Sequence, residues 1–183
     1  MIGKGKSISH GVAALEYDLA KEINGQAVAT EIARHELYGC TGAEMVQEMK
    51  PYHIDFPNVK NNCLRFEVSP SIEESATFTD ADWAELGNDF MQRMGLANHQ
   101  YIIIRHSGTE SKKEQAHLHI LANRVSLSGE LYRDNWIGKK ATEAANAIAK
   151  ERNFVQSQDI GKVNKAEIKE AMDGVLKLSL IHI

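Results

Sequence analysis

Two apolar segments interrupted by histidines constrain the fold of this chain more than any other feature. The first, HQYIIIRH, ends at His106, and the second, AHLHILANRV, carries His117 and His119 two residues apart. Successive side chains of a strand point to opposite faces of a sheet, so these two histidines share one face and Leu118 and Ile120 share the other. The polar segment SGTESKKEQ between them predicts a loop. We therefore expect an antiparallel pair of strands.

The three histidines are expected to meet on this strand pair. If the strands pair around the loop, His106 lies across from the start of the second strand and can reach the point where His117 and His119 converge. Three neutral imidazoles from two adjacent strands form a rigid metal site with open coordination positions. The alternative is a solvated sheet face without a ligand, which a His-x-His pair alone would favour. The third histidine favours metal binding.

The remaining patterns predict an α+β domain with an antiparallel sheet. The best-marked helix begins after Thr79, an N-cap residue with Asp82 three positions on, and ends at Gly95. Other helices are expected at about residues 10–22 and in TGAEMVQEMK, WIGKKATEAANAIAKERN and NKAEIKEAMDGVLK. CLRFEVSPS and SLSGELYRD predict short strands, and the stretch 27–37 is ambiguous.

Composition limits the classes of protein to consider. With 183 residues, 43% hydrophobic and 25% charged, one sizeable globular domain is expected. The net charge of −4 argues against indiscriminate binding of polyanions. Two cysteines without a disulfide pattern fit a reducing compartment, and no apolar run has the length of a membrane span. We expect a cytoplasmic protein without a membrane span.

Three segments together carry a resemblance to a known family. RHSGTE…AHLHILANRV resembles the His…HxHxxxNRV motif of the relaxase/mobilisation nuclease family, in the HUH endonuclease superfamily. RFEVSPSIEESATFTDADWAELGNDFMQRMGL is similar to its second motif, and GVAALEYDL to the first motif, which holds a nucleophilic tyrosine. The resemblance covers about residues 1–150. It implies a central five-stranded antiparallel sheet with flanking helices, and His-x-His on a central strand.

The same resemblance implies an activity. A relaxase nicks one DNA strand at a transfer origin by tyrosine transesterification, leaving a 5′-phosphotyrosine intermediate during conjugative mobilisation. In this chain Tyr17 would be the nucleophile, with Tyr38 and Tyr101 as fallbacks. The three histidines would hold Mg²⁺ or Mn²⁺, which stabilises the charge of the scissile phosphate. Single-stranded origin DNA and accessory mobilisation proteins are the implied partners.

Further residues are expected to contact DNA. By resemblance Ser69 would bind a phosphate, although a turn residue before Pro70 is an equal alternative. Asn123 is expected to orient a histidine, to contact DNA or to form a hydrogen bond at the end of its strand. Arg124 is expected to have a structural role or to bind a backbone phosphate. A basic groove is a further expectation, made of Lys4, Lys6, Lys139, Lys140, Lys150 and Arg152.

One position departs from the family pattern. The family usually carries Asp two residues after its first histidine, whereas this chain has Gly108 there and a longer segment before His-x-His. Glu110 lies in the same loop and is a possible acidic helper. This departure keeps open a non-catalytic metal- or DNA-binding remnant of a relaxase. A rolling-circle replication initiator, which shares the His-x-His site, is the other alternative.

The end of the chain looks foreign to the rest. LSLIHI, residues 178–183, resembles the translation of a sequencing-library adapter, with an ordinary apolar strand as the alternative. We expect residues 1–177 to form the relaxase domain, as the N-terminal part of a longer protein, and 178–183 to be a non-native tail.

Overall fold

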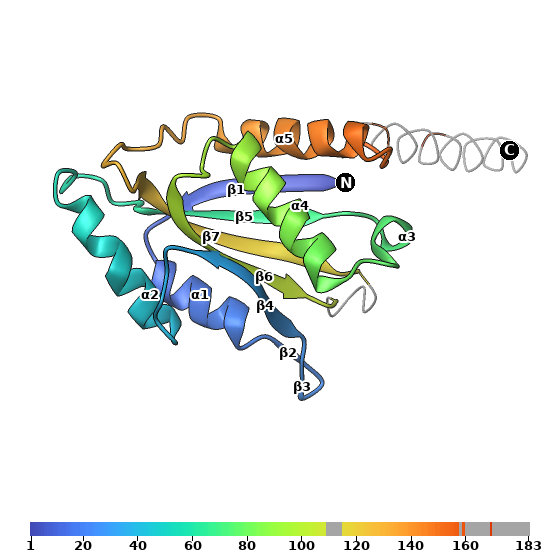
Figure 1. Cartoon of the computed structure of the whole chain (residues 1–183), viewed down its shortest axis with the longest axis horizontal. Coiled ribbons are helices and arrows are strands. Elements are labelled where there is room, and N and C mark those ends of the chain that lie inside the picture. The colour runs from blue at the N-terminus through green and yellow to red at the C-terminus, as the bar shows by residue number, and fades with distance from the viewer. Residues whose placement is uncertain (109–114, 158, 160–168, 170–183) are drawn as a thin grey trace, which may run out of the picture.

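The structure is a computed structural model that describes residues 1–108, 115–157, 159 and 169. Its strands and helices follow one another along the chain as shown in Figure 1. The strands are β1 (Ile2–Ile8), β2 (Glu22–Ile23), β3 (Gln26–Ala27), β4 (Ala29–His35), β5 (Cys63–Ser69), β6 (His99–His106) and β7 (His117–Ser126). The helices are α1 (Gly11–Leu19), α2 (Gly42–Met49), the 3₁₀ turn η1 (Lys50–His53), α3 (Ile72–Ser75), α4 (Asp80–Arg93) and α5 (Ile137–Glu151).

The main sheet has five strands in the order β1-β5-β7-β6-β4, so β7 is central. Every neighbouring pair is antiparallel. His106 on β6 stands directly opposite His117 on β7. The expected α+β fold with a five-stranded antiparallel sheet is confirmed.

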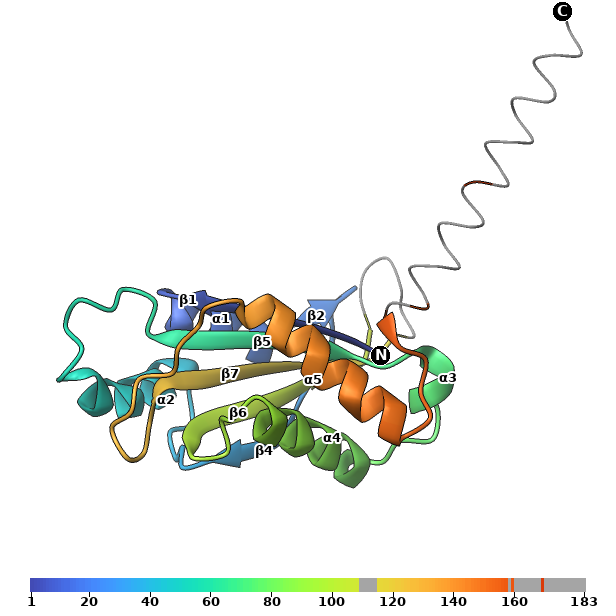
Figure 2. The same cartoon turned by 90° about the horizontal axis from the view of Figure 1, so that it is seen from above.

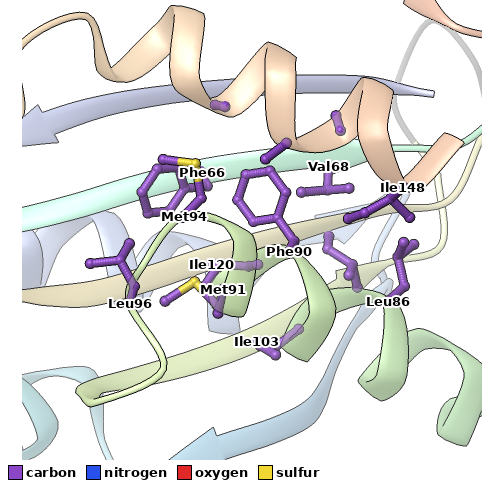
Figure 3. Close-up of a cluster of buried hydrophobic side chains, with 14 of the residues drawn as sticks. Phe66, Val68, Leu86, Phe90, Met91, Met94, Leu96, Ile103, Ile120 and Ile148 are labelled. Atoms are coloured by element: carbon purple, nitrogen blue, oxygen red, sulfur yellow. The ribbon is translucent and has the colours of Figure 1, made fainter. Parts of the chain in front are cut away.

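One face of the sheet is covered by α4 and α5, which lie next to each other in Figures 1 and 2. The apolar side chains of β5, β6 and β7 meet those of both helices there, and Figure 3 shows this core. It includes Phe66, Val68, Ile103 and Ile120 from the strands, Leu86, Phe90 and Met91 from α4, and Ile148 from α5. Burial of this apolar area is the main source of the sheet's stability.

The opposite face is only partly covered. Ile102, Ile104 and Leu121 pack there with residues of α1 and α2 in a second apolar cluster. That cluster reaches the edge strand β1 at Ile8, where β1 pairs with Cys63 of β5. The other end of β1 carries exposed side chains on this face. Because β-strand side chains alternate, this is the face that His106, His117 and His119 share.

Several predicted element limits are confirmed and others are corrected. Thr79 caps α4 in a capping box with Asp82, as predicted. The first helix ends at Leu19 rather than near residue 22. The reason is a hairpin of β2 and β3 that turns at Asn24 and Gly25, both at positive φ, a turn that this residue pair favours.

Other predictions concern the strands and the end of the chain. The ambiguous stretch 27–37 contains β4, and SLSGELYRD forms a turn with a single bridge between Val125 and Leu131. NKAEIKEAMDGVLK and the tail 178–183 fall almost entirely outside the described residues. Within the described part of the chain, no helix has the length and apolarity needed to cross a membrane.

Candidate metal centre

The fold brings the three predicted histidines together. One ligand nitrogen each from His106, His117 and His119 lies within 4.8 Å of the others. The ring centroids of His106 and His119 are 4.4 Å apart, and those of His117 and His119 are 4.9 Å apart. Two strands of one rigid sheet hold all three rings, so the cluster is organised by the backbone. Three imidazoles at this spacing are a donor set that suits a divalent metal ion.

Backbone carbonyls determine which nitrogen of two rings carries the proton. His106 Nε2 lies 2.7 Å from the carbonyl oxygen of Asp18, and His117 Nδ1 lies 3.2 Å from that of Gln115. A carbonyl oxygen only accepts, so these nitrogens donate, and His106 Nδ1 and His117 Nε2 keep their lone pairs. Such partners to the outer nitrogen orient metal-binding histidines. Both rings are therefore set to act as ligands.

Burial favours the uncharged form of two of the three rings. His106 is 2% and His117 is 7% exposed, and the side chain of His119 is 12% exposed. Desolvation lowers the pKa of His106 from its ordinary value. Desolvation, with smaller contributions from His106 and Arg65, lowers the pKa of His119 to about 2. Neutral imidazoles at pH 7 can bind a metal without first releasing a proton to the solvent.

A buried ion pair borders His119. Arg65 on β5 donates to Asp18 through Nε at 3.0 Å and Nη2 at 2.5 Å, and Asp18 is 1% exposed. Arg65 Nη2 is also 3.3 Å from His119 Nδ1, so in this arrangement Nδ1 accepts and Nε2 donates to His117 Nε2 at 3.1 Å. Binding a metal through His119 Nε2 requires the proton on Nδ1 instead. Asp18 Oδ1, 3.9 Å from Nδ1, is then the acceptor at hand.

The helix that carries Tyr17 is therefore attached to the histidine cluster. Asp18 contacts His106 through its carbonyl oxygen and lies beside His119 through its carboxylate. Tyr17 immediately precedes Asp18 and is 56% exposed. The ammonium of Lys21 donates to the Tyr17 hydroxyl at 2.6 Å. A partly exposed phenol thus stands next in sequence to a buried residue that touches two of the histidines.

The two fallback tyrosines have different surroundings. Tyr38 follows β4 and is 75% exposed, with its hydroxyl donating to Glu36. Tyr101 belongs to the core on the α4 side, where its hydroxyl donates to Asn88. It therefore lies on the opposite face of the sheet from the histidines, as the alternation of β6 predicts.

Ser69 ends β5 on the histidine face. It is 9% exposed, and its hydroxyl accepts a hydrogen bond from Gln115 Nε2 at 3.1 Å. Gln115 also offers its carbonyl oxygen to His117. Ser69 is therefore connected to the cluster through one intervening residue.

Asn123 and Arg124 are held by groups within the protein. Asn123 is fully buried, with Oδ1 2.7 Å from His53 Nε2 and Nδ2 donating to Gln100 at 3.0 Å. Arg124 forms an ion pair with Asp134 at 2.7 Å, and the rest of its guanidinium donates to backbone carbonyls. The contacts that the structure describes for these two side chains are structural.

The loop that differs from the family pattern is described only in part. Gly108 is buried, two residues after the end of β6. Glu110, the possible acidic helper, lies outside the described residues. Asp18 is instead the acid that the structure places beside the histidines.

The six basic residues expected to form one groove are divided between two faces. Lys4 and Lys6 lie on the half of β1 that is left uncovered on the histidine face. The other four belong to α5 or directly follow it, and α5 packs on the opposite face. Arg152 among them is paired with Glu85 at 2.9 Å.

Asp18, Arg65 and Glu67 are the site residues that sequence patterns did not identify. The alternation of CLRFEVS does put Arg65 and Glu67 on the polar face of a strand. Their neighbours depend on the register, in which Glu67 stands opposite His119. Asp18 had no signal beyond its position next to Tyr17, because a buried helix carboxylate is recognised only through its tertiary partner.

The solved structures similar to this chain include the conjugative relaxase TrwC in complex with oriT DNA, metal-free and metal-bound. They share 10% and 12% sequence identity with it, each with a TM-score of 0.49, over 87% of this chain and 70% of the other. No curated protein matches significantly.

A family model provides the assignment. The model for the nuclease domain of MobA/VirD2-like relaxases matches residues 17–154, well over half of the chain. The matched range begins at Tyr17 and includes all three histidines. The chain belongs to the MobA/VirD2-like relaxase family and is a DNA relaxase with a nuclease domain.

Proposed function

We propose that this relaxase nicks single-stranded DNA at a transfer origin with Tyr17 as nucleophile and a divalent metal held by His106, His117 and His119. The observation that carries the proposal is the double contact of Asp18 with His106 and His119. This contact attaches the end of α1, and with it Tyr17, to the histidine cluster. A nucleophile and a charge-stabilising centre fixed to each other are what phosphoryl transfer requires.

The proposed step conserves the number of phosphodiester bonds. The Tyr17 oxygen forms a bond to phosphorus, the bond from phosphorus to the 3′ oxygen breaks, and the phenol proton leaves while the 3′ oxygen gains one. A phenol is a weak nucleophile at neutral pH, so charge on its oxygen needs stabilisation. Lys21, whose ammonium donates to the Tyr17 hydroxyl, is placed to provide it.

A divalent metal at the histidine cluster would supply Lewis-acid stabilisation of the charge on the scissile phosphate. The donor set supports this, because each of the three imidazoles places one ligand nitrogen within 4.8 Å of the other two. All-imidazole ligation favours Mn²⁺ over the harder Mg²⁺, although cellular abundance favours Mg²⁺. We propose Mn²⁺ or Mg²⁺. Isothermal titration of the metal-stripped protein with each ion would decide between them.

The nucleophile is tested by trapping the covalent product. The full chain is incubated with Mn²⁺ and single-stranded oligonucleotides that tile a candidate transfer origin, and adducts are resolved on a denaturing gel. The wild type should form an adduct, Tyr17→Phe should form none, and the exposed control Tyr38→Phe should match the wild type. An adduct that survives in Tyr17→Phe would overturn the assignment of Tyr17.

The test also separates the proposal from the alternatives. Metal binding and DNA binding without any adduct would indicate a relaxase remnant that only binds. An adduct on Tyr132, the only tyrosine after the His-x-His motif, would favour the arrangement of a replication initiator. Tyr132 is half-buried, with Lys140 Nζ 5.0 Å from the centre of its ring, which makes it a poor candidate.

The setting of the reaction is part of the same proposal. A free Cys63 inside the core and a free Cys40 on the surface support a reducing compartment such as the cytoplasm. Accessory mobilisation proteins are proposed partners for bringing origin DNA to the site. Co-purification with the products of adjacent mobilisation genes would test that part.

A further inference from the structure

A cavity of about 200 Å³ adjoins the histidine cluster on the uncovered part of the sheet. It lies over β1, β5 and β7 and is lined by Lys4, Gly5, Lys6, Arg65, Phe66, Glu67 and His119. His119 belongs to both the cavity and the metal cluster. A group bound in the cavity would therefore lie next to whatever is bound at the histidines.

The register gives the distance scale. Lys4 pairs with Glu67, and Glu67 pairs with His119, so the three stand in one row across three adjacent strands and point to the same face. Adjacent strands are about 4.8 Å apart, which places the backbones of Lys4 and His119 roughly 10 Å apart. The ammonium of Lys4 is directed toward β5, because it donates to Glu67 Oε1 at 2.9 Å. Glu67 in turn stands directly opposite His119, so Lys4 is one residue removed from the cluster in this row.

The cavity is positively charged, and two of its cations are available to a ligand. Three cations face a single anion, Glu67, which pairs with Lys4 at 2.9 Å. That pair is exposed, with 64% of the Lys4 side chain accessible, and exposed pairs contribute little and exchange readily. Lys6 is exposed and forms no ion pair with any residue in the described part of the chain. Arg65 below them is held by Asp18.

We propose that Lys4 and Lys6 form a phosphate subsite beside the Arg65–Asp18 ion pair, and that this subsite binds the DNA phosphodiester next to the scissile one. The inference rests on the proposed function, because it places the same DNA strand across β5 and β1. The cavity's lining includes two exposed lysine ammoniums, which are point charges suited to phosphate oxygens. The subsite should therefore position the strand without reading its sequence.

The first test measures how binding to single-stranded DNA depends on salt. Binding of a fluorescent oligothymidylate to the full chain is followed from 0.05 to 0.5 M KCl, in a Tyr17→Phe background that prevents covalent trapping. Two lost phosphate contacts reduce the slope of log affinity against log salt by about 1.4. Lys4→Gln with Lys6→Gln should show this reduction and a loss of affinity of about tenfold or more at 0.1 M KCl.

A matched control removes the same charge elsewhere. Lys139 and Lys150 are exposed on α5, on the other face of the sheet, so Lys139→Gln with Lys150→Gln should keep nearly the wild-type slope. Equal salt slopes for the wild type and both double variants would overturn the subsite. Equal losses of DNA affinity in the two double variants would also overturn it. Absence of single-stranded DNA binding by the wild type would overturn the subsite and the proposed function together.

The second test locates the subsite relative to the nick. Once the covalent adduct identifies the nicked bond, single neutral methylphosphonates replace the phosphates on either side of it. At the phosphate held by the subsite, the methylphosphonate should weaken DNA binding by the wild type. It should weaken DNA binding by the Lys4→Gln/Lys6→Gln variant much less, because that variant has already lost the contact. Such non-additivity reports direct contact. Additive losses at both neighbouring positions would overturn the placement while leaving the Tyr17 adduct, and hence the proposed function, unaffected.

Discussion

The two faces of the sheet are built from the same strands and have opposite chemistry. On β7, Ile120 is fully buried under α4 and α5, whereas its neighbour His119 turns to the face that α1 and α2 leave partly open. The apolar face is closed and continuous. The other face has an apolar cluster at one end of the sheet, and histidines, Arg65 and two lysines at the other. One strand can therefore both anchor itself and present metal ligands, since each function uses alternate residues.

The largest expected effect comes from removing the ligands. His117→Ala with His119→Ala should abolish measurable Mn²⁺ binding in isothermal titration and eliminate the covalent DNA adduct, because two of three imidazoles are lost. The far-ultraviolet circular dichroism spectrum should be unchanged, because the core under α4 and α5 does not include these side chains. Metal binding equal to that of the wild type would show that His117 and His119 are not the metal ligands.

Substitution of Ile120, the residue after His119, should lower stability but leave metal binding intact. Ile120→Ala removes a fully buried side chain from the α4 side and should lower the free energy of unfolding by about 2–5 kcal/mol in urea titrations. Below the unfolding transition its Mn²⁺ affinity should stay within about threefold of wild type. A large loss of metal affinity in a folded Ile120→Ala protein would show that the two faces are coupled.

Asp18 connects α1 to the histidine cluster on the partly open face of the sheet. Asp18→Asn keeps the size of the side chain but weakens the acceptor for His119 Nδ1–H, so Mn²⁺ affinity should fall by about 10- to 100-fold. Arg65→Lys is the matched variant, since it keeps a charge near Asp18 without the fork-shaped pairing. Because Arg65 does not serve as that acceptor, its replacement should weaken metal binding far less. Equal effects would contradict the role given to Asp18.

The smallest effect concerns pH. Burial lowers the pKa of His119 to about 2, so below its ordinary pKa of about 6.5 the unfolded chain binds a proton that the folded chain does not. The free energy of unfolding in the presence of a chelator should therefore fall as pH drops below 6.5, by about 1 kcal/mol per pH unit from this residue. His119→Gln should flatten that slope between pH 6.5 and 5. An unchanged slope would contradict the burial argument.

The strands β6 and β7 were predictable because the segments that form them have strong sequence signals. His106, His117 and His119 were identified by the alternation of imidazole with Leu and Ile, and α4 by its capping residues. The strand β1 gave no such signal, since GKGKSI places glycine where an apolar side chain would be expected. The structure supplies the reason. A Cβ on Gly3 would lie 2.4 Å from the carbonyl oxygen of Ala141, so α5 packs directly on the strand backbone.

The acidic part of the site could not be predicted for a different reason. The expected position, two residues after His106, holds Gly108, and sequence alone pointed to Glu110 in the following loop. The structure instead places Asp18 beside His119, through a contact between α1 and the sheet that spans most of the domain's sequence. Long-range contacts of this kind follow from packing and register, which local patterns do not encode.

The assignment of Tyr17 as nucleophile is tested most directly by finding the residue that carries the DNA. The covalent product of the full chain with its origin oligonucleotide is digested with protease and nuclease, and the peptide that retains the nucleotide is identified by mass spectrometry. We predict a single modified peptide containing Tyr17, formed with Mn²⁺ and absent with a chelator. A modified peptide containing another tyrosine, or equal modification in the presence of a chelator, would contradict this prediction.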